Sequence, residues 1–232
     1  MRLIIASCIF LAGALFPVMV SSDDQPVVVE LFTSQGCSSC PPVDVYLADL
    51  AKQSNVIALA WHVDYWDYIG WKDSFASPVF TERQRAYAHA QKQRMVYTPQ
   101  LIVNGVDHIK GKIYDEVSAA ILKVTAQKAF IKLSSSRAGA AYAVTLSAGH
   151  QNGAFDVQLV RVSPNNTVEI LHGENAGKTV SYVNVVMDWR SLGWWDGQDK
   201  VTFRTGDLAQ GKYAILVQDQ GHGEIIAAAW LQ

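Results

Sequence analysis

Two cysteines separated by two serines are the residues of this sequence that are best suited to chemistry. Cys37 and Cys40 follow an apolar run, at a predicted strand-to-helix turn. The N–H groups and the dipole at a helix start stabilise a thiolate, which lowers the pKa of the first thiol and makes it a nucleophile. The second thiol, one turn further on, can then resolve a mixed disulfide. The spacing therefore favours thiol–disulfide exchange, with protein thiols or disulfides as the expected partners.

Two other uses of the same cysteines stay open at this stage. Zinc usually takes four ligands and the sequence has no second cysteine pair, so we assign no metal ligand and no cofactor. Two thiolates together with His62 suit Cu(I), which makes a copper-binding protein one alternative. The other alternative is a non-catalytic binding module in which Cys37 and Cys40 form a structural disulfide.

Residues 1–22 have the features of a secretory signal peptide. Arg2 precedes an almost wholly apolar stretch, and Val20 and Ser22 form a small-residue pair before a cleavage point. We expect a periplasmic or secreted protein that is not membrane-bound after cleavage; an uncleaved anchor is the alternative, because the run has borderline length for a span. Cleavage removes Cys8, and the two remaining cysteines are expected to pair in an oxidising compartment.

The composition argues against several classes of function. Half of the residues are hydrophobic and 17% are charged, which is typical of a soluble globular protein with a real core. The formal net charge of −2 gives no basic excess, so we expect no nucleic-acid partner. The sequence also lacks a phosphate-binding loop and a dinucleotide-binding fingerprint.

The elements that position the cysteines are predicted within residues 26–129. Apolar and β-branched runs predict strands at 27–33, 56–63, 100–103 and 106–109, the last two joined by a turn at Asn104-Gly105. Helical spacing predicts helices at 41–51, 78–94 and 114–127. The predicted order is βαβαββα, with a parallel crossover between the first two strands.

Residues 130–232 have a different pattern. Short alternating runs predict strands at 142–146, 156–160, 201–203 and 213–217, with turn clusters at 163–166 and 221–223. We therefore expect a second, mostly antiparallel β-sandwich-like domain that begins between Lys128 and Arg137. Its segments 172–175 and 189–196 are candidates for a face that packs on the thiol domain or admits a partner.

The first of these domains resembles the thioredoxin fold. The resemblance rests on the βαβαββα order, on Cys37-Ser38-Ser39-Cys40 after the first strand, and on Thr98-Pro99 before the third. It implies that Pro99 is cis and that Thr98 and Pro99 present backbone groups to an extended substrate peptide. An ordinary trans proline is the alternative. Gly36, the Ser38-Ser39 spacer and Pro41-Pro42 depart from the thioredoxin pattern, which leaves the direction of electron flow open.

Longer motifs are similar to a family of secreted bacterial proteins that is known only as a domain of unknown function. The motifs are residues 30–42, residues 61–67 and Gly173-Glu174-Asn175. The resemblance extends over nearly the whole mature chain. It implies the fold and export, and it supplies no reaction.

Glu30 is a candidate catalytic residue. It is an acid within an otherwise apolar strand, and a buried carboxyl group with a raised pKa can move protons near neutral pH. Thioredoxin has a buried acid in the corresponding strand, and the resemblance implies a proton relay from Glu30 to Cys40. A structural salt bridge is an equal alternative.

The residues after the second strand are candidates for substrate binding. Ligands of parallel sheets bind at the carboxyl ends of the strands, so this segment is expected beside Cys37 as a pocket wall. The candidates are His62, Asp64, Tyr65 and Trp66. The alternative is a packed loop with a capped histidine. Lys72 and Asp73 are expected to form a surface pair.

Overall fold

The structure is a computed structural model that describes residues 25–109, 113–127, 131–148 and 152–231. The predicted signal peptide, including Cys8, lies outside the described residues. Within the described ranges no helix is long and apolar enough to cross a membrane.

The described chain begins with strands and helices in the predicted order. They are β1 (Val27–Thr33), α1 (Pro41–Leu50), β2 (Val56–His62), the 3-10 helix η1 (Asp67–Ile69), α2 (Pro78–Ala90), β3 (Gln100–Val103), β4 (Asp107–Ile109) and α3 (Ile113–Thr125). β1 pairs with β2 in parallel and with β3 in antiparallel orientation. The predicted βαβαββα order and the parallel crossover are confirmed, although α2 ends four residues before the predicted limit.

The remainder of the described chain consists of strands. They are β5 (Ile131–Ala138), β6 (Ala141–Ala148), β7 (Phe155–Ile170), β8 (Lys178–Trp195), β9 (Val201–Arg204), β10 (Lys212–Asp219) and β11 (Ile225–Trp230). The predicted turn at 163–166 is wrong, because these residues continue β7. β10 pairs with β7 only as far as Val162, so β7 beyond this point has β8 as its one neighbouring strand. Pro164 lies in this part of β7, where its lack of an N–H group costs no hydrogen bond to β10.

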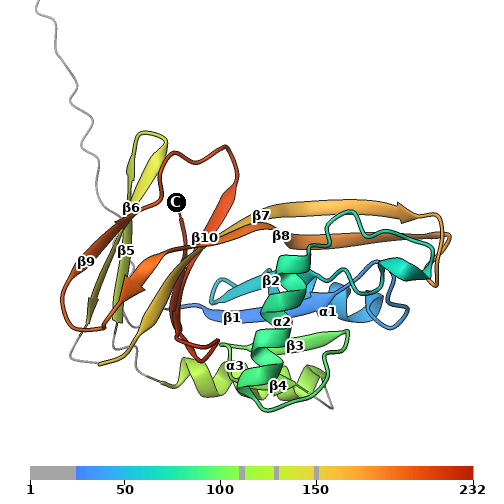
Figure 1. Ribbon diagram of the computed structural model, residues 1–232, viewed down its shortest axis with the longest axis horizontal. Helices are drawn as coiled ribbons and strands as arrows, with labels where there is room; N and C mark the ends of the chain where they lie inside the picture. The colour runs from blue at the N-terminus through green and yellow to red at the C-terminus, as the bar shows by residue number, and fades with distance from the viewer. Residues whose placement is uncertain (1–24, 110–112, 128–130, 149–151, 232) are drawn as a thin grey trace, which may run out of the picture.

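One eight-stranded sheet contains strands from both predicted domains. Its order is β11-β10-β7-β8-β2-β1-β3-β4, and β8 joins β2 by a parallel pairing of Val185 with Ala60. A second sheet has the order β5-β6-β9. In Figure 1 the long β7–β8 hairpin extends from the end that holds the small sheet towards the end that holds the start of α1. The fold is thus mixed α/β with a large sheet and few helices, and the domain boundary near residue 130 stays a prediction.

The large sheet is covered on both faces. Val27, Val29 and Leu31 of β1 share a core with α1 and α3, whereas Val28 and Phe32 share another with α2. A third core lies between the small sheet and β7, β10 and β11. Because side chains alternate along a strand, neighbouring residues of β1 belong to opposite faces of the sheet. This alternation decides which polar residues lie near the cysteines.

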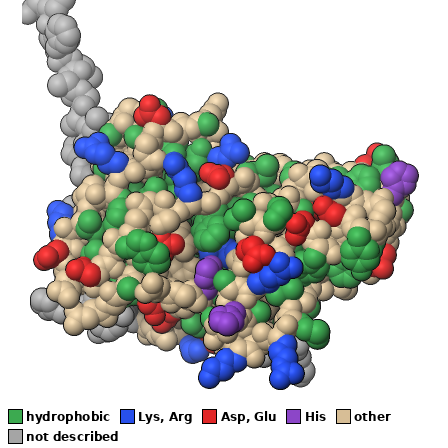
Figure 2. All heavy atoms as spheres, viewed as in Figure 1, with side chains coloured by type: hydrophobic (Ala, Val, Ile, Leu, Met, Phe, Trp, Pro, Cys, Tyr) green, Lys and Arg blue, Asp and Glu red, His purple; other side chains and the backbone are tan. Residues whose placement is uncertain are grey.

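Charged side chains show no large single-sign patch on the face seen in Figure 2. Acidic and basic side chains are interspersed over both ends of the molecule, and hydrophobic side chains gather near its middle. This distribution agrees with the small formal net charge of −2.

Candidate functional site

The two cysteines form a disulfide at the start of α1. The Cα atoms of Cys37 and Cys40 are 5.4 Å apart, and Cys40 is the N-cap residue of the helix. The carbonyl oxygen of Cys40 accepts the N–H groups of Val43 (2.8 Å) and Asp44 (3.0 Å). The first N–H groups of a helix have no partner within it, so the prolines at the first two helical positions cost the helix no hydrogen bond. α1 therefore begins directly after the disulfide.

Both cysteines are buried, whereas the two serines between them are exposed. Cys37 is 1% exposed and Cys40 is 0% exposed. The hydroxyl oxygen of Ser39 lies 3.5 Å from Sγ of Cys37. A molecule approaching the disulfide therefore meets the Ser38-Ser39 turn first.

The tip of the β7–β8 hairpin holds the segment that precedes the disulfide. Nδ2 of Asn175 donates to the carbonyl oxygens of Gln35 (2.9 Å) and Cys37 (2.8 Å), and Asn175 is itself buried. Nζ of Lys178 donates to Oδ1 of the same amide at 2.8 Å. The expected packing of segment 172–175 on the thiol segment is confirmed.

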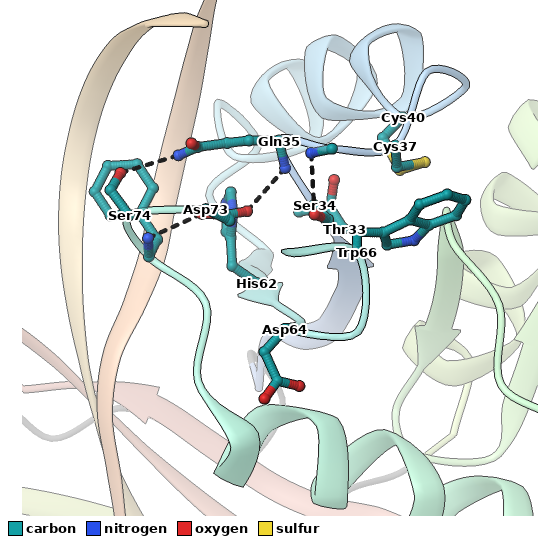
Figure 3. Close-up of polar contacts among 12 residues, drawn as sticks. Thr33, Ser34, Gln35, Cys37, Cys40, His62, Asp64, Trp66, Asp73 and Ser74 are labelled. Carbon is teal, nitrogen blue, oxygen red and sulfur yellow. Dashed lines mark hydrogen bonds and ion pairs between the residues drawn. A yellow bond between two sulfur atoms is a disulfide. The ribbon is translucent and has the colours of Figure 1, made fainter. Parts of the chain in front are cut away.

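The loop after β2 packs closely against Gly36, the residue before Cys37. A Cβ atom on Gly36 would lie 3.1 Å from Cδ1 of Ile69 and 3.1 Å from Cβ of Trp66. Figure 3 shows the Trp66 ring beside the disulfide. A side chain at position 36 would therefore require Ile69 and Trp66 to shift.

Trp66 also connects this loop to the segment before β3. Its Nε1 donates to Oγ1 of Thr98 at 2.7 Å. The Thr98–Pro99 peptide bond is cis, as the resemblance to thioredoxin implied, and both residues are half-buried. The structure thus places Trp66 and Thr98 together on the side of the site that carries the disulfide.

Asp64 and Tyr65 both form hydrogen bonds to α2, and the Tyr65 ring also packs beside Trp66 with ring centroids 6.4 Å apart. Oγ1 of Thr81 donates to Oδ1 of Asp64 at 2.6 Å, and the hydroxyl of Tyr65 donates to Oε1 of Gln84 at 3.1 Å. Figure 3 shows the Asp64 carboxylate directed towards the start of α2. Asp64 therefore anchors α2, whereas Trp66 lies beside the disulfide.

His62 forms a buried pair with Asp73. Its Nδ1 lies 2.7 Å from Oδ2 of Asp73, and both side chains are at most 1% exposed. Asp73 also accepts the backbone N–H groups of Gln35 (2.8 Å) and Phe75 (2.9 Å). Burial opposes ionisation, but His62 and these two donors outweigh it and hold the pKa of Asp73 below its ordinary value. The expected surface pair of Lys72 and Asp73 is therefore wrong, and His62 is the capped histidine of the alternative.

An acid that the sequence analysis did not identify lies on α1. Asp44 is 3% exposed, Oγ1 of Thr33 donates to its Oδ1 at 2.8 Å, and its Oδ2 has no hydrogen-bond partner in the part of the chain that the structure describes. Burial raises the pKa of Asp44 from 3.8 to about 7, against the lowering effects of His62 and of the Thr33 hydrogen bond. Asp44 follows Cys40 by four residues, so the two side chains share one side of the helix start.

A sequence signal for Asp44 does exist. Val43, Leu47 and Leu50 form the inward-facing stripe of α1, and Asp44 lies within that stripe. An acid at a core-facing position one turn after a CxxC cysteine is unusual, because ionised carboxylates are rarely buried unless they are paired.

Glu30 lies on the opposite face of the sheet from α1. Its carboxylate accepts Nε of Arg83 at 2.8 Å and the hydroxyl of Tyr87 at 2.5 Å, and all three residues are buried on the α2 side. The structural salt bridge of the alternative is therefore present. The predicted proton relay from Glu30 to Cys40 is therefore wrong, because β1 separates the Glu30 carboxylate from the helix that carries Cys40.

No ready-made metal centre occurs among the described residues. Across these ranges no group of three or more His, Cys, Asp or Glu is arranged to hold an ion. The copper alternative required His62 as a ligand together with the two cysteine thiolates, and Nδ1 of this histidine is already bound to Asp73.

Comparisons with known proteins identify a family whose function is unknown. The family model described as "Protein of unknown function (DUF1223)" matches residues 28–218. The solved structure of protein AGR_C_4864 from Agrobacterium tumefaciens is 38% identical, with a TM-score of 0.73 over 88% of this chain and 93% of that chain. HBP35 of Porphyromonas gingivalis is 14% identical, with a TM-score of 0.63 over 90% and 75% of the two chains, which is a likeness of fold alone. No curated protein matches the chain.

Proposed function

The chain belongs to the DUF1223 family of proteins of unknown function, and we propose that it is an exported, thioredoxin-like protein that exchanges thiols and disulfides through Cys37 and Cys40. The observation that carries the proposal is the position of the disulfide at the start of α1, with the buried acid Asp44 one helical turn after Cys40. A helix start stabilises the thiolate of the attacking cysteine, and a carboxyl group that titrates near pH 7 can exchange a proton with the other cysteine.

The thioredoxin-like assignment is supported by the arrangement of the first seven main elements. The βαβαββα order, the parallel β1–β2 pair, the antiparallel β3 and the helices on both faces agree with it. So does the disulfide between the end of β1 and the start of α1. The β7–β8 hairpin, which extends the same sheet beyond β2, is an addition to that arrangement.

The exchange step is a pair of thiolate displacements. A substrate thiolate attacks Sγ of Cys37, a mixed disulfide forms, and the electron pair of the broken Cys37–Cys40 bond goes to Sγ of Cys40. The carboxyl group of Asp44 donates its proton to that sulfur. A second substrate thiolate then attacks the substrate sulfur of the mixed disulfide and releases Cys37 as a thiolate. The substrate leaves as a disulfide, and the same steps run in reverse.

Export and the class of substrate are part of the proposal. The features of residues 1–22 support secretion or a periplasmic location, where disulfides persist. The exposed Ser38-Ser39 turn and the half-buried Trp66, Thr98 and Pro99 support an extended polypeptide that carries thiols as substrate.

A trapping experiment tests the reaction. The mature protein is incubated with a fluorescent peptide that contains two cysteines, and the products are separated without reductant. We expect the oxidised wild type to oxidise the reduced peptide and Cys37→Ser to be inactive. Reduced Cys40→Ser, incubated with the disulfide form of the same peptide, is expected to form a mixed disulfide through Cys37, because its thiolate breaks the peptide disulfide and no second cysteine resolves the product. Equal behaviour of all three proteins would exclude exchange.

A structural disulfide in a binding module is the second candidate function. The observation that favours it is the burial of both cysteines, which are at most 1% exposed. In that case the peptide is not oxidised, and the disulfide resists reduction by glutathione.

A further inference from the structure

Two buried polar atoms near the disulfide lack hydrogen-bond partners. They are Oδ2 of Asp44 on α1 and Nε2 of His62 at the end of β2, and neither has a partner among the residues that the structure describes. Their residues are 3% and 0% exposed. More than nine-tenths of buried polar groups in proteins are paired, so two such atoms in one region of the core indicate a role beyond packing. His62 also acts electrostatically on the Asp44 carboxyl group.

The surroundings hold His62 firmly in one orientation. Asp73 binds its Nδ1, while the rings of Phe75 and Tyr182 pack against its ring with centroid distances of 5.3 Å and 4.8 Å. The titratable groups that act on Asp44 and His62 from the neighbouring elements are Asp73 in the loop before α2 and Tyr182 on β8. With Nδ1 engaged by Asp73, Nε2 is the nitrogen that is left to act on another group.

We propose that His62, oriented by Asp73, is a positioning residue that controls proton transfer between Asp44 and Cys40. When the Cys37–Cys40 bond breaks, Asp44 gives its proton to Sγ of Cys40 and becomes a buried carboxylate. A buried carboxylate is costly unless an opposite charge lies near it, and the imidazolium form of His62 supplies that charge. The inference rests on the proposed exchange reaction and assigns its proton chemistry to residues of α1, β2 and the loop before α2.

The pH profile of disulfide reduction tests this role. The rate constant for reduction of the oxidised protein by dithiothreitol is measured from pH 5 to 9 and expressed per thiolate. The wild-type value is expected to fall through about pH 7 as Asp44 loses its proton. His62→Asn keeps an N–H group for Asp73 and removes the cation that stabilises the Asp44 carboxylate. The midpoint is therefore expected to move up by roughly one pH unit, and the rate per thiolate below the midpoint, where Asp44 is protonated in both proteins, is expected to fall. His89→Asn, an exposed histidine at the end of α2, is the matched control and keeps the wild-type profile.

A second readout does not depend on exchange. The titration of the Asp44 carboxyl carbon is followed by NMR in the oxidised wild type, and its midpoint is expected to rise in His62→Asn. If that variant does not fold, coupling is read in the wild type, where Asp44 and His62 must each report both transitions. Unchanged midpoints or independent single transitions overturn the inference and leave the exchange reaction standing. Loss of exchange in the wild type, with coupled titrations intact, overturns the proposed function instead.

Discussion

The side-chain amide of Asn175 donates to the carbonyl oxygen of Cys37 over 2.8 Å, although the two residues are 138 positions apart in the sequence. The same nitrogen also donates to the carbonyl oxygen of Gln35. The tip of the β7–β8 hairpin is thus part of the thiol site. The strand-rich part of the chain therefore shapes the chemistry of a motif that lies in the first part.

Replacement of Asn175 by alanine is expected to destabilise the protein. The change leaves the carbonyl oxygens of Gln35 and Cys37 without their donor in a buried site, which costs about 1–3 kcal/mol. Urea denaturation of the oxidised protein measures the effect. Asn165→Ala, at an exposed position of β7, is the control and should change the stability little. Equal midpoints for the two variants would show that the hairpin tip does not hold the cysteine segment.

Asp44 makes the stability depend on pH in a definite direction. The folded state raises the pKa of Asp44 from 3.8 to about 7 because of burial, so it binds the proton more tightly than the unfolded chain does. The stabilisation is fully present below about pH 4 and is lost as the pH rises through about 7, a difference of roughly 4 kcal/mol. Asp44→Asn keeps an acceptor for Thr33 and removes this loss.

Urea denaturation at pH 5 and pH 8.5 checks this prediction. The wild type is expected to lose more stability between the two values than Asp44→Asn, and at pH 8.5 the variant is expected to be the more stable protein by about 1–3 kcal/mol. Asp49→Asn is the control on the same helix, because Asp49 forms an exposed pair with Lys52. A wild-type pH dependence that persists in Asp44→Asn would contradict the assignment.

Glu30 is expected to matter for stability and not for exchange. Glu30→Gln removes the charge that pairs with the buried guanidinium of Arg83 and should cost about 3–5 kcal/mol. Glu82→Gln breaks the exposed pair with Arg85 and should cost less than about 1 kcal/mol. The folded fraction of Glu30→Gln should oxidise the dicysteine peptide at the wild-type rate. A loss of rate in the folded protein would restore the proton relay that the sequence suggested.

Local patterns were sufficient to predict the elements around the cysteines. The apolar run 27–33 and the Asn104-Gly105 turn report on structure within a few residues, and both predicted features are confirmed, as is the expected pairing of Cys37 with Cys40. Four of the seven strands described after residue 130 were located, whereas β5, β8 and β11 were not predicted, and Pro164 was interpreted as part of a turn. A proline is tolerated at this position of β7 because β10 stops pairing with β7 before it. That limit is set by the arrangement of the sheet and cannot be read from the local sequence.

The polar partnerships could not be predicted, because they join distant segments. His62 and Asp73 are eleven positions apart in the sequence, and Arg83 on α2 reaches Glu30 on β1. Asp73 was expected at the surface, but it is buried and accepts three hydrogen bonds. Asp44 was within reach of a sequence argument, since it interrupts the apolar stripe of α1, but the role of its neighbours required the fold.

The reduction potential of the Cys37–Cys40 disulfide tests the central claim most directly. The mature protein is equilibrated in graded glutathione buffers, quenched with an alkylating agent and analysed by mass spectrometry. Exchange through these cysteines predicts a potential between roughly −120 and −270 mV, the range of known exchange catalysts. A potential below about −300 mV would contradict the account, because it would identify the disulfide as a structural staple.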